Sequence, residues 1–297
     1  MSTSSSNGGI DFALYRYTPS IVAAIIFAAI FLGITVVHSF RLWQNRTYFF
    51  IPFIIGLLFE CAGYIARVFS HYDTKALGPY IVQTMLILVA PPLFAASIYM
   101  SLGRVIVGLD CQEYSLVPVR FLTKIFVIGD VISFLLQCGG GGYMAAGSVS
   151  AMNMGANIVI GGLVIQLLFF GFFVIVSAVF HWRVKRNSRN ESHAMKGLGK
   201  NWEPIMWALY AACFLILVRS IFRVVEFVEG NDGYIMKREY LLYIFDACLM
   251  ALAGSVLVII YPGSFLGRER GTRDSSLQLM STTEEDISTQ KSTAYGV

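Results

Sequence analysis

The sequence predicts an all-α membrane protein, a seven-transmembrane helix bundle with its N-terminus outside and its C-terminus in the cytosol. Of its 297 residues, 56% are hydrophobic and only 13% are charged, whereas soluble domains are about 25% charged. The apolar residues form long runs, unlike the short alternating segments of a membrane β-barrel. The basic residues gather in alternate loops, which indicates a fixed orientation in the membrane.

Seven apolar segments approach the ~20 residues that a helix needs to cross a bilayer. Pro19 favours a helix start at the first of them. The polar residues 1–18 are expected outside the cell, residues 19–263 in the membrane domain, and residues 264–297 in a cytosolic tail with too few apolar side chains to fold. The spans are expected at about 19–40, 48–70, 79–102, 121–143, 155–181, 204–228 and 240–261.

The basic residues set the predicted orientation. Fifteen lysines and arginines lie in the loops after the first, third and fifth spans and in the tail, and four lie on the opposite side. Cytosolic loops of membrane proteins carry the excess of positive charge. We therefore expect the fifteen-residue side to face the cytosol.

The sixth span carries three charged residues, Arg219, Arg223 and Glu226, at positions i, i+4 and i+7. This spacing places them on one face of a helix. A charge at the bilayer centre costs about 2.5–3.5 kcal/mol on insertion scales. This face is therefore expected to point into the bundle, where opposite charges can pair with it.

Three further spans carry a polar stripe of the same kind, and all four stripes are expected to meet inside the bundle. From their depths along the helices, at about 1.5 Å per residue, Arg219 is predicted to pair with Glu60 or Asp246. Gln83 and Gln166 add polar groups from the third and fifth spans. The residues predicted to bind a substrate are Glu60, Tyr64, Arg67, Gln83, Asp130, Gln137, Arg219, Arg223, Glu226, Glu239 and Asp246.

Two interpretations of these stripes remain open. Ionisable residues inside a membrane usually mark a functional site, which favours a polar head-group site at the end of an apolar cavity. The alternative is a sealed ion-pair network that only holds the helices together.

Prolines and glycines mark two candidate hinges. Pro91 and Pro92 in the third span remove intrahelical hydrogen bonds and favour a kink, either static or moving. Gly139 and Gly140 begin a run of four glycines at the end of the fourth span. Such a run either loosens the helix into a gate or lets two backbones approach closely.

The sequence gives no indication of catalytic residues, a metal site, a cofactor or a nucleic-acid interface. The five cysteines form no CxxC pair, and the four histidines lie mostly in loops, whereas zinc sites need several close ligands. No span carries a lysine for a retinal Schiff base, and no ATP-binding motif is present.

Several motifs together resemble the fungal lipid-translocating exporter family, the RTA-like seven-helix proteins. The resemblance runs from Tyr17 to about Gly263. It includes Glu60-x-x-Gly63-Tyr64-x-x-Arg67, Asp130-x-x-Ser133-x-x-x-Gln137, Arg219-x-x-x-Arg223-x-x-Glu226, and Glu239 with Tyr243-x-Phe245-Asp246. Two positions depart from the family pattern, since Arg238 and Tyr261 stand where many members have histidine.

The resemblance implies movement of, or resistance to, amphipathic lipids and drugs such as sphingoid bases, sterol-like amines or porphyrins. Family members lie in the plasma membrane or in internal membranes, and the plasma membrane is expected for this multi-pass protein. Membrane lipids or amphipathic small molecules are then the expected partners, and the oligomeric state is left open. A seven-helix lipid sensor that signals to the cytosol is the alternative. An intramembrane enzyme is disfavoured because no nucleophile and base converge.

Overall fold

The computed structural model describes residues 20–72, 77–109, 111–144, 148–187, 202–230, 233–234 and 238–263. The predicted N-terminal segment 1–18 and the tail 264–297 lie outside these residues. Within them the chain is helical, with short turns and no strand. The all-α prediction is therefore confirmed.

The long helices follow the predicted spans closely. Ser20 caps the first helix, because its hydroxyl accepts a hydrogen bond from the Ala23 backbone N–H. The elements are α1 (Ile21–Asn45), η1 (Tyr48–Phe50), α2 (Ile51–Tyr72), α3 (Leu77–Gly108), η2 (Gln112–Tyr114), α4 (Val119–Met144), α5 (Val149–Asn187), α6 (Trp202–Glu229), α7 (Glu239–Leu242), the π-helical η5 (Tyr243–Cys248) and α8 (Leu249–Ile259).

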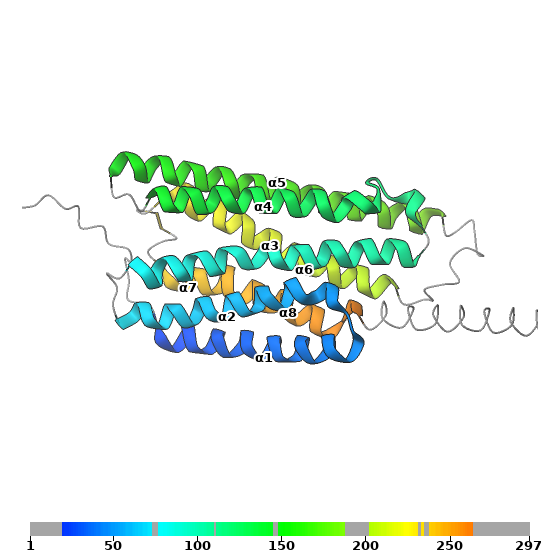
Figure 1. Cartoon of the computed structure of the whole chain (residues 1–297), viewed down its shortest axis with the longest axis horizontal. Helices are drawn as coiled ribbons and strands as arrows, with labels where there is room; N and C mark the ends of the chain where they lie inside the picture. Colours follow the sequence, from blue (N-terminus) through cyan, green and yellow to red (C-terminus); the bar gives the residue numbers. More distant parts are fainter. Residues whose placement is uncertain are drawn as a thin grey trace, which may run out of the picture.

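The helices form an alternating bundle (Figure 1). α1, α3, α5 and the continuous helix α7–η5–α8 run in one direction, and α2, α4 and α6 run in the other (Figure 1). Sequence neighbours pack side by side, with close α1–α2, α2–α3 and α4–α5 pairs. α6 connects the α4–α5 pair to the other helices, because it packs against α5 as well as against α3 and α8.

Among the described residues, six helices are long and apolar enough to cross a membrane by length and composition. They are Ile21–Asn45, Tyr48–Tyr72, Val82–Gly108, Ser150–Asn187, Trp202–Glu229 and Glu239–Ile259. The fourth predicted span is not in this set. It is nonetheless a 26-residue helix, α4, which lies in the same bundle against α5.

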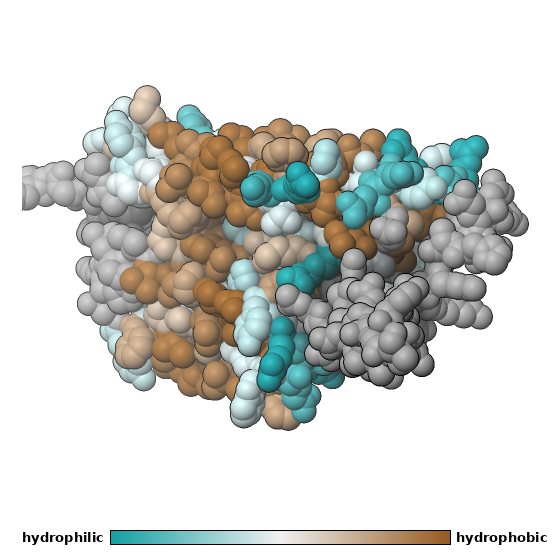
Figure 2. All heavy atoms as spheres, turned by 45° about the vertical axis from the view of Figure 1, so that its right-hand side comes forward, coloured by the Kyte–Doolittle hydropathy of each residue, from teal (hydrophilic) through white to brown (hydrophobic). Residues whose placement is uncertain are grey.

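The surface has the character of a membrane protein. Large apolar side chains lie exposed along the helices, including Val22, Phe69, Leu168 and Phe214. The space-filling view shows a broad hydrophobic belt across the bundle and hydrophilic residues gathered toward one end (Figure 2). The protein is an integral membrane protein.

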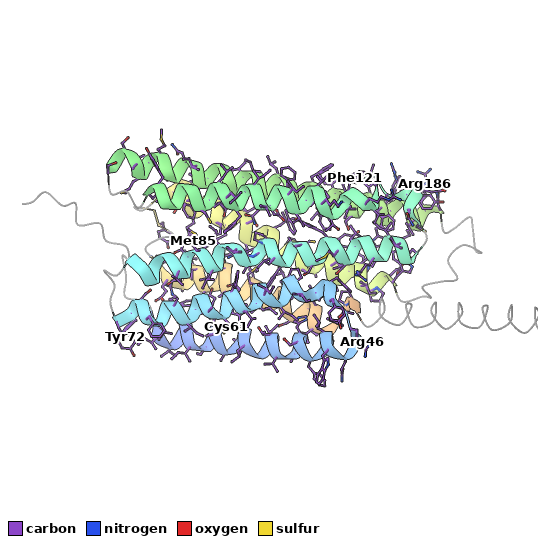
Figure 3. The ribbon with its side chains drawn as sticks, viewed as in Figure 1. Arg46, Cys61, Tyr72, Met85, Phe121 and Arg186 are labelled. Atoms are coloured by element: carbon purple, nitrogen blue, oxygen red, sulfur yellow. The ribbon has the colours of Figure 1, made fainter. Side chains whose placement is uncertain are left out.

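The two ends of the bundle differ in charge. Arg46 at the end of α1 and Arg186 near the end of α5 lie at the same end, and Tyr72 lies at the opposite end (Figure 3). This arrangement follows from the alternating helix directions. It brings the basic residues Arg46 and Arg186 at the ends of α1 and α5 to one side of the molecule.

Candidate functional site

The charged stripe of α6 points into the bundle. Arg219, Arg223 and Glu226 are all buried, with at most 7% of each residue exposed. They face α2, α3 and the helix that begins at Glu239. The prediction that this face avoids lipid is confirmed.

Asp246 is the centre of an ion-pair network. Its carboxylate pairs with the Arg219 guanidinium, and its Oδ2 accepts a hydrogen bond from Arg223 Nη2 at 3.1 Å. Arg223 Nη1 also donates to Glu226 Oε2 at 2.8 Å. Glu60 Oε1 lies 3.9 Å from Arg219 Nη2. We call these five residues the ion-pair network, and they confirm the predicted pairing of Arg219.

The π-helical turn of η5 carries Asp246. π-helical turns occur frequently at functional sites, because the inserted residue breaks the regular hydrogen bonding of the helix. Here the turn separates α7 from α8 and includes both Tyr243 and Asp246. Tyr243 contacts Arg67 of α2, and Asp246 contacts Arg219 and Arg223 of α6.

A second polar group joins the network toward the end of α2. Arg67 pairs with Glu239 at 3.0 Å, and its Nε donates to the Tyr243 hydroxyl at 3.1 Å. The same Glu239 oxygen accepts a hydrogen bond from the Ser20 backbone N–H at 2.8 Å. These contacts fasten the start of α1 to α2 and α7.

Arg219 also forms a hydrogen bond with α3, one turn before Pro91. Pro91 has no backbone N–H, so the carbonyl four residues before it, that of Ile87, lacks its usual intrahelical donor. Arg219 Nη2 donates to this carbonyl at 2.8 Å. The helix continues through Pro91 and Pro92 without a break. In membrane helices a neighbouring group commonly satisfies such a freed carbonyl.

Glu60 is the least satisfied member of the network. Its side chain is fully buried, and neither carboxylate oxygen accepts a hydrogen bond from the described residues. One turn away, the buried Tyr64 hydroxyl also lacks a hydrogen-bond partner there. Buried polar groups are normally hydrogen-bonded. Glu60 and Tyr64 therefore lack the partners that buried polar groups normally have.

The charges around Glu60 do not balance. Counting Arg67 and Glu239 with the network gives three arginines, Arg67, Arg219 and Arg223, against four carboxylates, Glu60, Glu226, Glu239 and Asp246. The difference is one negative charge when every group is ionised. Glu60 is the carboxylate without a close partner, so a cation or a proton is most needed there.

The stripe of α4 does not join this network. Asp130 Oδ2 accepts a hydrogen bond from the Tyr99 hydroxyl of α3 at 3.0 Å. Gln137 Nε2 donates to Gln166 Oε1 of α5 at 2.9 Å. Within the described residues, these contacts reach none of the charged groups on α2, α6 or η5. The expectation that all four stripes point into the bundle interior is confirmed, since Asp130, Ser133 and Gln137 are buried, but α4 turns its polar face to α3 and α5 and not to the ion-pair network.

The glycine run of α4 is helical, so it does not form the loosened helix end that was one of the two predicted alternatives. The helix extends to Met144, and α5 packs closely against it. A Cβ at Gly140 would lie 2.7 Å from the Gly155 carbonyl oxygen, whereas a Cβ at Gly139 would meet nothing within 4 Å. Gly140 therefore serves close backbone approach, and Gly139 does not.

Sequence reasoning missed several participants. Tyr99 stands in an apolar run and reads as a core aromatic residue, so nothing in the sequence connects it to Asp130. The Ile87 carbonyl is a backbone group and was not among the predicted residues. Pro91, four residues later, could have indicated it, because a proline leaves that carbonyl without its intrahelical donor. Of the remaining predicted residues, Gln83 is buried in α3, and Pro92 is partly buried. Among the described residues, no group of three His, Cys, Asp or Glu is arranged to hold a metal ion.

Comparison with known protein families decides the identity. A family model described as "RTA1 like protein" matches residues 53–269, which run from the first turn of α2 past the end of α8. The chain belongs to the RTA1-like family. The resemblance seen in the sequence motifs is therefore confirmed. No solved structure matches the chain.

Relatives of this RTA1-like protein have been described in Saccharomyces cerevisiae. The chain is 38% identical to Protein RTM1 over 303 aligned positions, with 89% of this chain and 95% of RTM1 covered. It is 37% identical to Protoporphyrin uptake protein 1, with 90% and 95% covered. It is 27% identical to Sphingoid long-chain base transporter RSB1, with 78% and 69% covered. The names of the latter two describe proteins of uptake or transport.

Proposed function

We propose that this RTA1-like protein moves amphipathic lipids or drugs across the membrane, and that the ion-pair network binds their polar head group. The observation that carries this proposal is Glu60, a fully buried carboxylate that accepts no hydrogen bond from the described residues. An intramembrane charge without a satisfying partner is costly. A bound cationic head group would remove that cost.

The charge balance favours a cationic substrate. With three arginines against four carboxylates, the site lacks one positive charge. The ammonium group of a sphingoid base or of a sterol-like amine would supply it, and its apolar body would lie among the surrounding helices. The relative named as a sphingoid long-chain base transporter supports this class of substrate.

The proposed setting is a seven-span protein in the plasma membrane, with the N-terminus outside. The alternating helix directions support seven crossings, with α4 as the fourth (Figure 1). The basic residues Arg46 and Arg186 at one end of the bundle support that end as the cytosolic one (Figure 3). The Arg67–Glu239 end then faces outward, and the head group enters from that side.

A lipid sensor is the second candidate, and the Arg219–Ile87 hydrogen bond favours it. This contact connects the ion-pair network to the proline turn of α3, a helix that extends to Gly108 at the opposite end of the bundle. A head group that draws Arg219 away would release the Ile87 carbonyl. The turn could then change its geometry without any lipid crossing the membrane.

Reconstitution separates the two candidates. The purified protein is placed in liposomes, and a fluorescent sphingoid base is followed between the two leaflets, with protein-free liposomes and an Arg219→Ala variant as controls. Movement that depends on the protein and is lost in the variant supports the transporter. Binding without movement supports the sensor, and the absence of both contradicts a sphingoid base as the ligand.

A further inference from the structure

Asp130 is a buried carboxylate that stands apart from the ion-pair network. Only 3% of the residue is exposed. Its Oδ2 accepts the hydrogen bond from Tyr99, and its Oδ1 has no hydrogen-bond partner among the described residues. No arginine, lysine or histidine of the described residues forms an ion pair with it. Its position therefore differs from that of Asp246, which is held between two arginines.

The groups around Asp130 are neutral on every side. From α3 it meets the Tyr99 phenol, whose electrostatic neighbour on α6 is the thiol of Cys213. α5 packs against this part of α4 with aromatic rings, including Phe169 against Gly129. Phe173 of the same helix lies with its ring centroid 4.4 Å from that of Tyr99. These titratable and aromatic neighbours supply no positive charge.

The rest of the α4 stripe is neutral as well. The Ser133 hydroxyl donates to the Gly129 carbonyl within α4 at 2.8 Å. Gln137 bonds with Gln166. A carboxylate surrounded by apolar and neutral polar groups is strongly disfavoured, and such a group takes up a proton instead of staying charged.

We propose that Asp130 and Tyr99 form a proton-binding site, in which the Asp130 carboxyl carries a proton in the resting protein. Hydronium from the solvent gives its proton to one carboxylate oxygen, so that one O–H bond of hydronium breaks, the carboxyl O–H bond forms and water remains. The site goes beyond the proposed head-group site, since it lies on α3 and α4 and takes a different ligand.

Tyr99 suits such a site because a hydroxyl can both donate and accept a hydrogen bond. When Asp130 is ionised, the phenol donates to the carboxylate. When Asp130 is protonated, its carboxyl O–H can donate a hydrogen bond to the phenol oxygen over the same contact. The pair therefore keeps its hydrogen bond in both protonation states, which an arginine partner would not allow.

Infrared spectroscopy tests the proposal directly, without any lipid substrate. The full-length protein in lipid nanodiscs is measured at neutral pH in H2O and in D2O, and the C=O stretching band of a protonated carboxyl group is compared between wild type and Asp130→Asn. We expect an Asp130 component of this band in the wild type, a shift of that component in D2O, and its loss in the difference spectrum between wild type and variant. Glu203→Gln is the matched control, since Glu203 is an exposed carboxylate near the start of α6, and this variant should keep the band.

A second variant covers the case in which Asp130→Asn does not fold. Tyr99→Phe removes the hydrogen-bond partner and should retain the band at a higher frequency. A wild-type spectrum without the band overturns the proposal, as does a band that is unchanged in both Asp130→Asn and Tyr99→Phe. Because the spectrum needs no transport, it can succeed when the proposed function fails, and the reverse also holds.

Discussion

Replacing Asp246 with asparagine removes the carboxylate on which two buried arginines converge. The asparagine side chain has nearly the same size, so the change acts on charge and leaves no cavity. Breaking a buried ion pair from one side costs about 3–5 kcal/mol, because the partner charge is left buried. Arg223 keeps Glu226 at 2.8 Å, and Arg219 keeps the Ile87 carbonyl and Glu60. The substitution also leaves three arginines against three carboxylates. We therefore expect Asp246→Asn to lower the free energy of unfolding by about 3 kcal/mol, the lower end of this range.

Two other substitutions in the network should differ from this value in a defined order. Arg219→Gln leaves four carboxylates against two arginines and removes the donor to Ile87, so its cost should be at the upper end, about 5 kcal/mol. Glu60→Gln removes a carboxylate whose one ion pair is long, 3.9 Å to Arg219, and leaves a balanced network. Because a buried charge without hydrogen bonds is costly, neutralising it should leave the free energy of unfolding near that of the wild type.

Reversible unfolding in mixed detergent micelles measures these differences, followed by tryptophan fluorescence and circular dichroism. The expected order of destabilisation is Arg219→Gln, then Asp246→Asn, then Glu60→Gln at or near wild type. Glu203→Gln is the control for the substitution itself, because its carboxylate is 46% exposed. If Glu60→Gln is the most destabilised variant, or if Arg219→Gln unfolds like wild type, the described balance of charges is wrong.

Two further predictions concern the helix contacts. Gly140→Leu should destabilise the protein by about 1–3 kcal/mol, because it forces side-chain atoms into the α4–α5 contact, whereas Gly139→Leu should be near neutral; equal effects of the two in the same unfolding assay would contradict the close approach. Pro91→Ala restores the N–H that bonds to the Ile87 carbonyl, so Arg219 loses its acceptor. In a double-mutant cycle, the cost of Arg219→Gln should then fall by about 1.5–3 kcal/mol, the worth of a hydrogen bond to a charged group; an unchanged cost would show that the contact does not contribute.

The fold was predictable because the length of the apolar runs indicates membrane-spanning helices. Each bilayer-spanning run is long and apolar, and helical structure is required where backbone groups have no water to bond with. The helix ends were less predictable. α5 extends from Val149 to Asn187, well beyond the expected 155–181, because hydropathy marks the membrane-embedded part and not the helical continuation outside it.

The ion-pair network was also largely predictable. Arg219, Arg223 and Asp246 must find opposite charges inside the bundle, and helical spacing with depth leaves few choices. The position of the α4 stripe was not predictable in the same way. Helical periodicity gives the polar face of one helix, but the neighbour that this face meets depends on how the helices pack. Asp130 therefore meets the neutral Tyr99, although charged partners were available on other helices.

The glycines of α4 show a further limit. Four consecutive glycines have poor helix propensity, and sequence reasoning left a gate and a close contact as alternatives. In the structure, packing of Gly140 against Gly155 and Val159 of α5 accompanies an unbroken helix. Tertiary contact therefore overrides the local preference. The Arg219–Ile87 hydrogen bond likewise depends on tertiary contact, since it joins two helices that are far apart in the sequence.

The most direct test of the account is the movement of a cationic lipid by Glu60→Gln in liposomes. The variant should unfold like wild type, because its network is balanced, and yet lose most of its movement of a fluorescent sphingoid base. Glu203→Gln should move the base at the wild-type rate, and neither protein should move an anionic fatty acid of the same chain length. A Glu60→Gln protein that transports the base as wild type does would contradict the assignment of Glu60 to the head-group site.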